Sequence, residues 1–120
     1  MTNIQELLQK RLKNENNELV RCIINDILEK GEDALTYMKD VVDYGCASGI
    51  VGTLIYTKDT HTFFDRYYNE IEDLRVNLLD EGIDVLSYIK DSDLKNHMAW
   101  MAYEEVVRKL LNELEAEIPS

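Results

Sequence analysis

Apolar residues recur every three or four positions along most of this chain, which is the spacing of amphipathic helices. No segment shows sustained alternation of apolar and polar residues, and the single proline is Pro119. The pattern therefore predicts an all-α fold. The stripes of the expected helices are Ile4, Leu7, Leu8 and Leu12; Leu19, Cys22, Ile23 and Ile27; Leu35, Met38, Val41 and Val42; Phe64, Tyr67, Ile71, Leu74 and Leu78; and Trp100, Tyr103, Val107, Leu110 and Leu114.

Polar residues and glycines indicate where these helices begin and end. The tract 14–17 is rich in turn formers and predicts a break after the first helix, although one long bent helix is the alternative. Gly31 is placed to stop the second helix, and Asp33 is placed to start the third. Asp59 or Thr60 is placed to cap a single helix that carries the longest stripe, which ends at Leu78.

The last expected helix, from about Asp93 to Glu117, has an apolar arc wider than one contact face needs. Its main stripe is accompanied by a second group of apolar residues. The helix is therefore predicted either to be central or to form part of a homodimer interface. The residues beside the main stripe are Met98, Met101, Ala102 and Val106.

One thirteen-residue pattern occurs twice. Residues 28–40 read LEKGEDALTYMKD and residues 79–91 read LDEGIDVLSYIKD, with seven positions identical. Such a repeat predicts that the chain is a compact helical bundle built from two copies of one three-helix unit. Gly31 and Gly82 are each expected to follow a helix with positive φ.

The two copies, at about 15–57 and 66–116, would follow a short N-terminal helix in a single domain spanning 1–120. Aligning their third helices predicts a structural notch. Gly49 aligns with Trp100 and Gly52 with Tyr103, so the two rings are expected to fill the space left by the two glycines. The alternative is that both glycines face a loop or a ligand.

Charge and composition narrow the classes of partner. Twenty-four acidic residues against thirteen basic ones give a net charge of -11, which disfavours direct binding to nucleic acid or anionic membranes. The longest apolar run, 46–56, is too short to span a bilayer, so no membrane segment is expected. Cys22 and Cys46 lack CxxC spacing, and no secretory signal is recognised, so free thiols and a cytoplasmic location are expected.

Two stretches resemble a known family. Asp43 to Asp65 (DYGCASGIVGTLIYTKDTHTFFD) and His97 to Glu105 (HMAWMAYEE) are similar to short, uncharacterised proteins encoded by phages and mobile elements of bacteria. The resemblance implies a genomic context and a small accessory protein that acts on a host or plasmid process. It implies no activity for any residue.

Motifs for phosphate, dinucleotide or zinc binding and nucleophile elbows do not occur in the sequence, so enzymatic function is disfavoured and no cofactor is expected. The best metal candidate combines His61 and Asp65, which share one helix face, with His97 and either Glu104 or Glu105 of the last helix. Against it, helical di-metal bundles use Glu-x-x-His pairs that are lacking here, and His61 also suits an exposed first turn.

Candidate binding residues are the repeated pair Tyr37 and Tyr88, because tyrosine is favoured at interfaces. Packing at the core edge is the alternative for both. An acidic run is the second candidate, with the charge density of a DNA mimic, and a solvated helix face is its alternative. The run consists of Glu70, Glu72, Asp73, Asp80, Glu81 and Asp84.

The leading hypothesis is a small acidic, non-enzymatic binding protein of phage or mobile-element type. Its acidic helical surface would engage a host protein with a basic or polar surface, and a nucleic-acid-binding protein is one conceivable target. The alternatives are a metal-binding or catalytic helical bundle and a homodimeric structural module.

Overall fold

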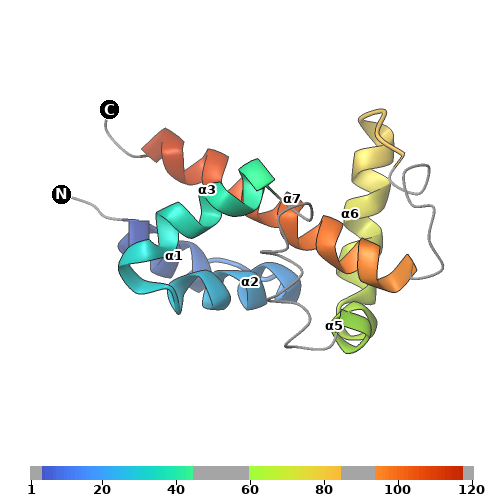
Figure 1. The fold of residues 1–120 in the computed structure, drawn as a ribbon, viewed down its shortest axis with the longest axis horizontal. Helices are drawn as coiled ribbons and strands as arrows, with labels where there is room; N and C mark the ends of the chain where they lie inside the picture. Colours follow the sequence, from blue (N-terminus) through green and yellow to red (C-terminus); the bar gives the residue numbers. More distant parts are fainter. Residues whose placement is uncertain (1–3, 45–59, 85–93, 118–120) are drawn as a thin grey trace.

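A computed structural model describes residues 4–44, 60–84 and 94–117 (Figure 1). These parts of the chain contain helices and no strand, so the all-α prediction is confirmed. None of the described helices is long and apolar enough to cross a membrane. The elements are α1 (Ile4–Lys13), α2 (Glu18–Leu28), the short 3-10 helix η1 (Gly31–Asp33), α3 (Ala34–Tyr44), α5 (Thr60–Arg66), α6 (Tyr68–Asp80) and α7 (Leu94–Glu117).

Helix α7 is the centre of the fold. It runs diagonally through the molecule in Figure 1 and packs against α1, α2, α3, α5 and α6. Met98, Ala102 and Val106 are buried, and so are Val107 and Leu110 of the main stripe. The prediction that this helix is central is confirmed. Met101, of the second apolar group, is half-buried. A homodimer interface on this helix stays a prediction.

The helices around α7 bury the stripes that the sequence predicted. Leu7 and Leu8 of α1, Ile23 and Ile27 of α2 and Met38 of α3 are all less than 9 % exposed. Burying a side chain of this size contributes roughly 1.5–3 kcal/mol relative to leaving it exposed. Helices α5 and α6 add Phe63, Phe64, Ile71, Leu74 and Leu78 to the core.

A break separates α1 from α2, as the turn-forming tract predicted. Asn17 caps α2, because its side-chain oxygen accepts hydrogen bonds from the backbone N–H groups of Leu19 at 2.9 Å and Val20 at 3.2 Å. The guanidinium of Arg21 donates to the backbone oxygens of Leu12 and Glu15. These bonds tie α2 to the chain that leaves α1, where the Leu12 oxygen also accepts from the backbone N–H of Glu15.

The expected single helix ending at Leu78 is interrupted, so that prediction is wrong. The chain turns at Tyr67, with φ −110° and ψ 28°, and α5 and α6 point in different directions (Figure 1). The ring of Tyr67 packs on Phe63, with centroids 5.2 Å apart, so aromatic packing holds the turn. The bend lets α5 pack on α7 while α6 contacts α2, and periodicity alone does not indicate such a bend.

The glycine prediction is confirmed. Gly31 has φ 58° and Gly82 has φ 91°, and both come after the end of a helix, where a residue without Cβ enters the left-handed region at little cost. The first helices of the two proposed repeat units are α2 and α6. The later helices cannot be compared, because 45–59 and 85–93 lie outside the described residues.

Candidate binding groove beside helix α6

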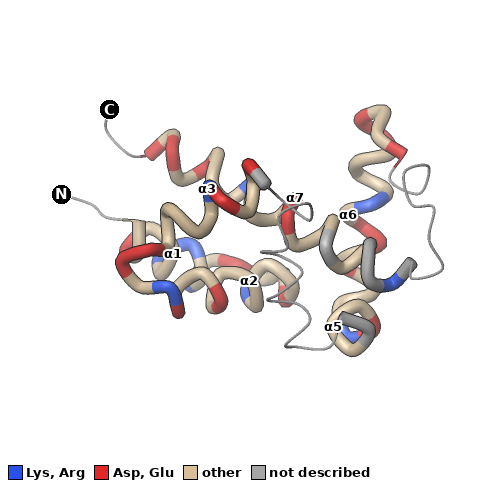
Figure 2. Tube along the Cα trace, viewed as in Figure 1, with Lys and Arg blue, Asp and Glu red and all other residues tan. Residues whose placement is uncertain are grey.

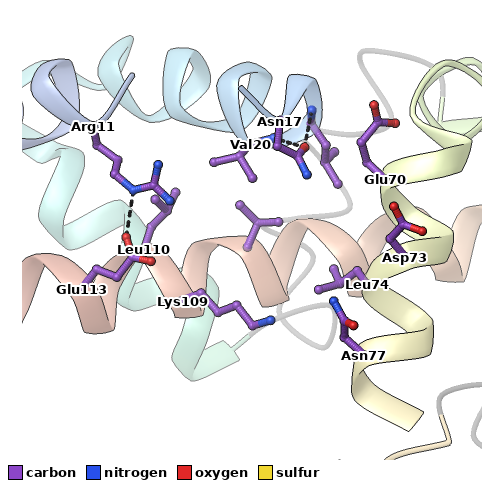
Figure 3. Close-up of a pocket in the computed structure, with 12 residues that line it drawn as sticks. Arg11, Asn17, Val20, Glu70, Asp73, Leu74, Asn77, Lys109, Leu110 and Glu113 are labelled. Atoms are coloured by element: carbon purple, nitrogen blue, oxygen red, sulfur yellow. Dashed lines mark hydrogen bonds and ion pairs between the residues drawn. The ribbon is translucent and has the colours of Figure 1, made fainter. Parts of the chain in front are cut away.

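A groove lies between α2 and α6, over the surface of α7, with Arg11 of α1 at one end (Figure 3). Its cavity volume is about 200 Å³. The polar residues of its α6 wall are Glu70, Asp73 and Asn77. Apolar side chains complete the lining, namely Leu19, Val20, Leu74, Val106 and Leu110. We call this feature the α6 groove.

Helix geometry explains the polar wall. Glu70, Asp73 and Asn77 are three and four residues apart, so they lie on one face of α6. At 100° per residue, the buried residues Ile71 and Leu78 lie about 100° further round the helix. The sequence therefore gives α6 a core face and, beside it, a polar face that borders the groove.

The carboxylates of Glu70 and Asp73 make no hydrogen bond or ion pair with any described residue. By contrast, Arg75 binds the neighbouring Glu72 and lowers the pKa of that carboxyl. The basic residue interleaved in the acidic run is thus already engaged. Two of the carboxylates that the sequence predicted as binding residues therefore face the groove without a partner.

Arg11 and Glu113 close one end of the groove. The Arg11 guanidinium donates to the Glu113 carboxylate at 2.9 Å and also binds Glu15 (Figure 3). The hydrogen bond to Glu113 is the main reason that the pKa of Arg11 is raised. Lys109 lies at the rim and forms no ion pair with the described carboxylates. The groove thus has apolar side chains along its length, and the charged groups of Glu70, Asp73 and Lys109 at its edge form no ion pair with described residues.

A polar network lies inside the core, away from the groove. The hydroxyls of Tyr37 and Tyr103 are 2.7 Å apart, and the Tyr103 hydroxyl donates to the Asp26 carboxylate at 3.4 Å. Asp26 is 6 % exposed and is the buried charged side chain of the described region. Burial raises the pKa of Tyr37 to about 12 and that of Tyr103 well above its usual value. Such a network joins α2, α3 and α7.

A family model described as "Domain of unknown function (DUF7222)" matches residues 16–116. The chain belongs to this family. The match includes the groove residues of α2, α6 and α7, whereas Arg11 lies before it. The comparison with curated proteins found no match, and the comparison with solved structures found none.

In this member of DUF7222, Tyr37 is in the core, as the packing alternative predicted, so a surface partner cannot reach its hydroxyl. Asp80, Glu81 and Asp84 are exposed at the C-terminal end of α6, outside the groove. Tyr88 lies outside the described residues. Of the acidic run, Glu70 and Asp73 therefore line the groove, Glu72 binds Arg75, and the last three members lie at or just after the end of α6.

The proposed metal ligands do not come together where they are described. Asp65 binds Lys95 at 2.9 Å, and Glu104 binds Arg108 at 3.0 Å. The side chains of His61 and His97 lie outside the described part. Among the described residues, no group of three acidic, histidine or cysteine side chains is placed to hold a metal. The metal site stays a prediction.

The predicted notch lies largely outside the described part, which includes neither Gly49, Gly52 nor the side chain of Trp100. Tyr103 is described, and it is 1 % exposed with its hydroxyl in the polar network. Sequence reasoning missed the groove residues Asn17 and Asn77. Asn77 carried a usable signal, because it continues the helical spacing of Glu70 and Asp73.

Proposed function

We propose that this protein is a small, non-enzymatic binding protein whose α6 groove accepts a lysine or arginine side chain from another protein. The observation that supports this proposal is the pair of unpartnered carboxylates, Glu70 and Asp73, beside an apolar lining. A basic side chain has an aliphatic stem and a charged end, so it matches both parts of such a groove.

The exposure of Glu70 and Asp73 to solvent determines how strongly they would bind a basic side chain. Glu70 is half-buried and Asp73 is exposed, so water screens both carboxylates. A single exposed ion pair contributes only about 0–1 kcal/mol. Stem contacts with Leu74 and Leu110 would therefore supply much of the affinity. The net charge of -11 favours basic partners at the encounter stage, most strongly at low salt.

The identity of the partner is a separate step of the proposal. That it is a host protein, acted on by a phage or mobile-element product, rests on the resemblance of residues 43–65 and 97–105 alone. A nucleic-acid-binding protein fits the required chemistry because its binding surface carries lysine and arginine.

The test compares the wild type with two variants of equal net charge. Glu70→Gln/Asp73→Asn removes the groove carboxylates, and Glu115→Gln/Glu117→Gln removes two exposed carboxylates near the end of α7. Each protein is immobilised and titrated with bacterial lysate at low and moderate salt, and bound proteins are quantified by mass spectrometry. We expect one protein to bind saturably to the wild type and the α7 variant, and about tenfold more weakly to the groove variant.

Two results would contradict this proposal. One is that no protein binds saturably at either salt concentration. The other is a partner whose affinity is the same for the groove variant and the α7 variant, because net charge alone would then explain the binding.

A further inference from the structure

The large apolar side chains that are exposed in the described part of the chain gather on one stretch. Tyr68 is 50 % exposed, Val76 42 %, Leu79 46 % and Ile83 43 %. All four belong to α6 or to the turn that follows it. Single exposed apolar residues are ordinary, but a group confined to one element indicates a contact surface.

The spacing of these residues gives α6 a third face. At 100° per residue, Tyr68, Val76 and Leu79 lie within an arc of about 80°, turned away from the core face and the groove face. Figure 1 shows the C-terminal half of α6 extending beyond α7, with no other labelled helix along it. From Tyr68 to Leu79 the helix rises about 16 Å, which is roughly three turns, and Glu72 lies on the same face between Tyr68 and Val76. Ile83 lies beyond the helix, in the turn where its backbone N–H donates to the Leu78 oxygen.

Charge is distributed unequally beside this apolar stripe. Asp73 and Asp80 lie on one edge and have no described partner, whereas Arg75 lies on the opposite edge and is held by Glu72. Figure 2 shows acidic residues at the free end of α6 and in the following turn. The stripe therefore has a negative edge that can attract positive charge and another edge whose cation is already bound.

We propose that the stripe Tyr68, Val76, Leu79 and Ile83 is a docking site for an amphipathic helix of another protein, with lysine or arginine along one side of that helix. An apolar row of about three turns matches the helical part of the stripe, and the basic flank matches Asp73 and Asp80. The apolar residues of this site lie on a different face of α6 from the groove, and Asp73 borders both sites. Asp80→Asn, which changes only this site, and Glu70→Gln, which changes only the groove, therefore separate this proposal from the proposed function.

Charge complementarity selects this partner over a second copy of the chain. If two copies paired through antiparallel α6 helices, Asp80 of each would approach the acidic edge of the other. Like charges placed opposite each other oppose binding. A helix with a basic flank removes this repulsion and gains attraction.

The test is a selection from a library of yeast-displayed helical peptides, randomised at all surface positions, with the full chain as the labelled probe. We expect enriched peptides to carry an apolar row with lysine or arginine on one side. Their affinity for Val76→Gln/Leu79→Gln should fall at least about tenfold, and that for Asp80→Asn about twofold to threefold. Thr36→Gln on α3 and Glu70→Gln in the groove should leave affinity unchanged.

Other outcomes overturn the inference. Failure to enrich any peptide, or enrichment of peptides without an apolar row or a basic flank, contradicts the proposed partner. A wild-type dimer in light scattering that Val76→Gln/Leu79→Gln dissociates would make a second copy the occupant. Peptides that lose affinity with Glu70→Gln and keep it with Val76→Gln/Leu79→Gln would overturn the stripe and leave the groove proposal standing.

Discussion

Helices α2 and α6 occupy equivalent places in the repeated sequence, yet the fold surrounds them differently. Shifting Glu18–Leu28 by fifty-one residues gives 69–79, which lies within α6. After each helix the same backbone bond forms, from Lys30 N–H to the Ile27 oxygen at 3.0 Å and from Glu81 N–H to the Leu78 oxygen at 3.1 Å. The local backbone is therefore similar in both places.

The side chains differ at the positions that decide burial. Ile24 of α2 is fully buried, and its equivalent in α6 is Arg75. Leu19 is likewise replaced by Glu70, and Cys22 by Asp73. Glu70 and Asp73 make one side of α6 a groove wall, whereas Arg75 lies on the opposite side, at the edge of the exposed apolar stripe. A sequence repeat thus predicts that two segments have the same backbone conformation. Positions that are apolar in one copy and polar in the other indicate which side chains are buried in only one of them.

The largest effect should come from exchanging the residues at one equivalent pair. Ile24→Arg places a charge in a fully buried site of α2 and should cost about 4 kcal/mol or more in the free energy of unfolding. Arg75→Ile breaks an ion pair on α6 and should leave the urea midpoint nearly unchanged. Equal effects of the two substitutions would show that the helices are not buried differently.

The next largest effect concerns the buried polar network around α2, which has no counterpart among the described residues around α6. Asp26 lies in the tyrosine network, whereas Asn77 at the equivalent position lines the groove. Because burial raises the pKa of Tyr37 from 10.0 to about 12, the folded state favours neutral tyrosine. Stability from this group is complete below pH 10 and is lost as the pH rises towards 12.

Urea unfolding between pH 9 and 11.5 measures this loss. We expect the wild type to lose about 1–2 kcal/mol more than Tyr37→Phe over this range. Tyr68→Phe changes an exposed tyrosine and should follow the wild type. If Tyr37→Phe has the same alkaline profile as the wild type, burial does not hold Tyr37 neutral.

The smallest effect concerns the glycine that follows each of the two helices. Gly31→Ala and Gly82→Ala should each cost about 1 kcal/mol, because both glycines have positive φ. Among the described residues, a Cβ at Gly31 would meet only Gln5 Nε2 at 3.7 Å, and one at Gly82 would meet nothing within 4 Å. Backbone conformation is thus the common cause, and thermal unfolding should show similar losses. A large difference would mean that the turns are not equivalent.

Local patterns predicted the helices well because spacing, turn formers and glycine act over a few residues. The break before Asn17, the start of the last helix and the positive φ of Gly82 all follow from such signals. The turn at Tyr67 was missed because it depends on how α5 packs on α7, and Tyr67 fits the helical stripe equally well.

The groove was predicted only in part. Glu70 and Asp73 were selected for their charge, but charge could not separate them from Glu72, which Arg75 engages. The opposite end of the groove depends on the pair Arg11 and Glu113, 102 residues apart in sequence. A single sequence carries no sign of such a pair, because it arises only when α1 packs beside α7.

The central position of α7 also sets the order in which the protein can fold during synthesis. Every other described α-helix packs on α7, and α7 is the last of them to leave the ribosome. The hydrogen bond between Asp26 and Tyr103 can form only after Tyr103 has been synthesised, 77 residues later. Until then the nascent chain exposes apolar residues such as Ile23 and Met38, which suit chaperone binding. Completion of the core is therefore expected only after Leu94–Glu117 has emerged.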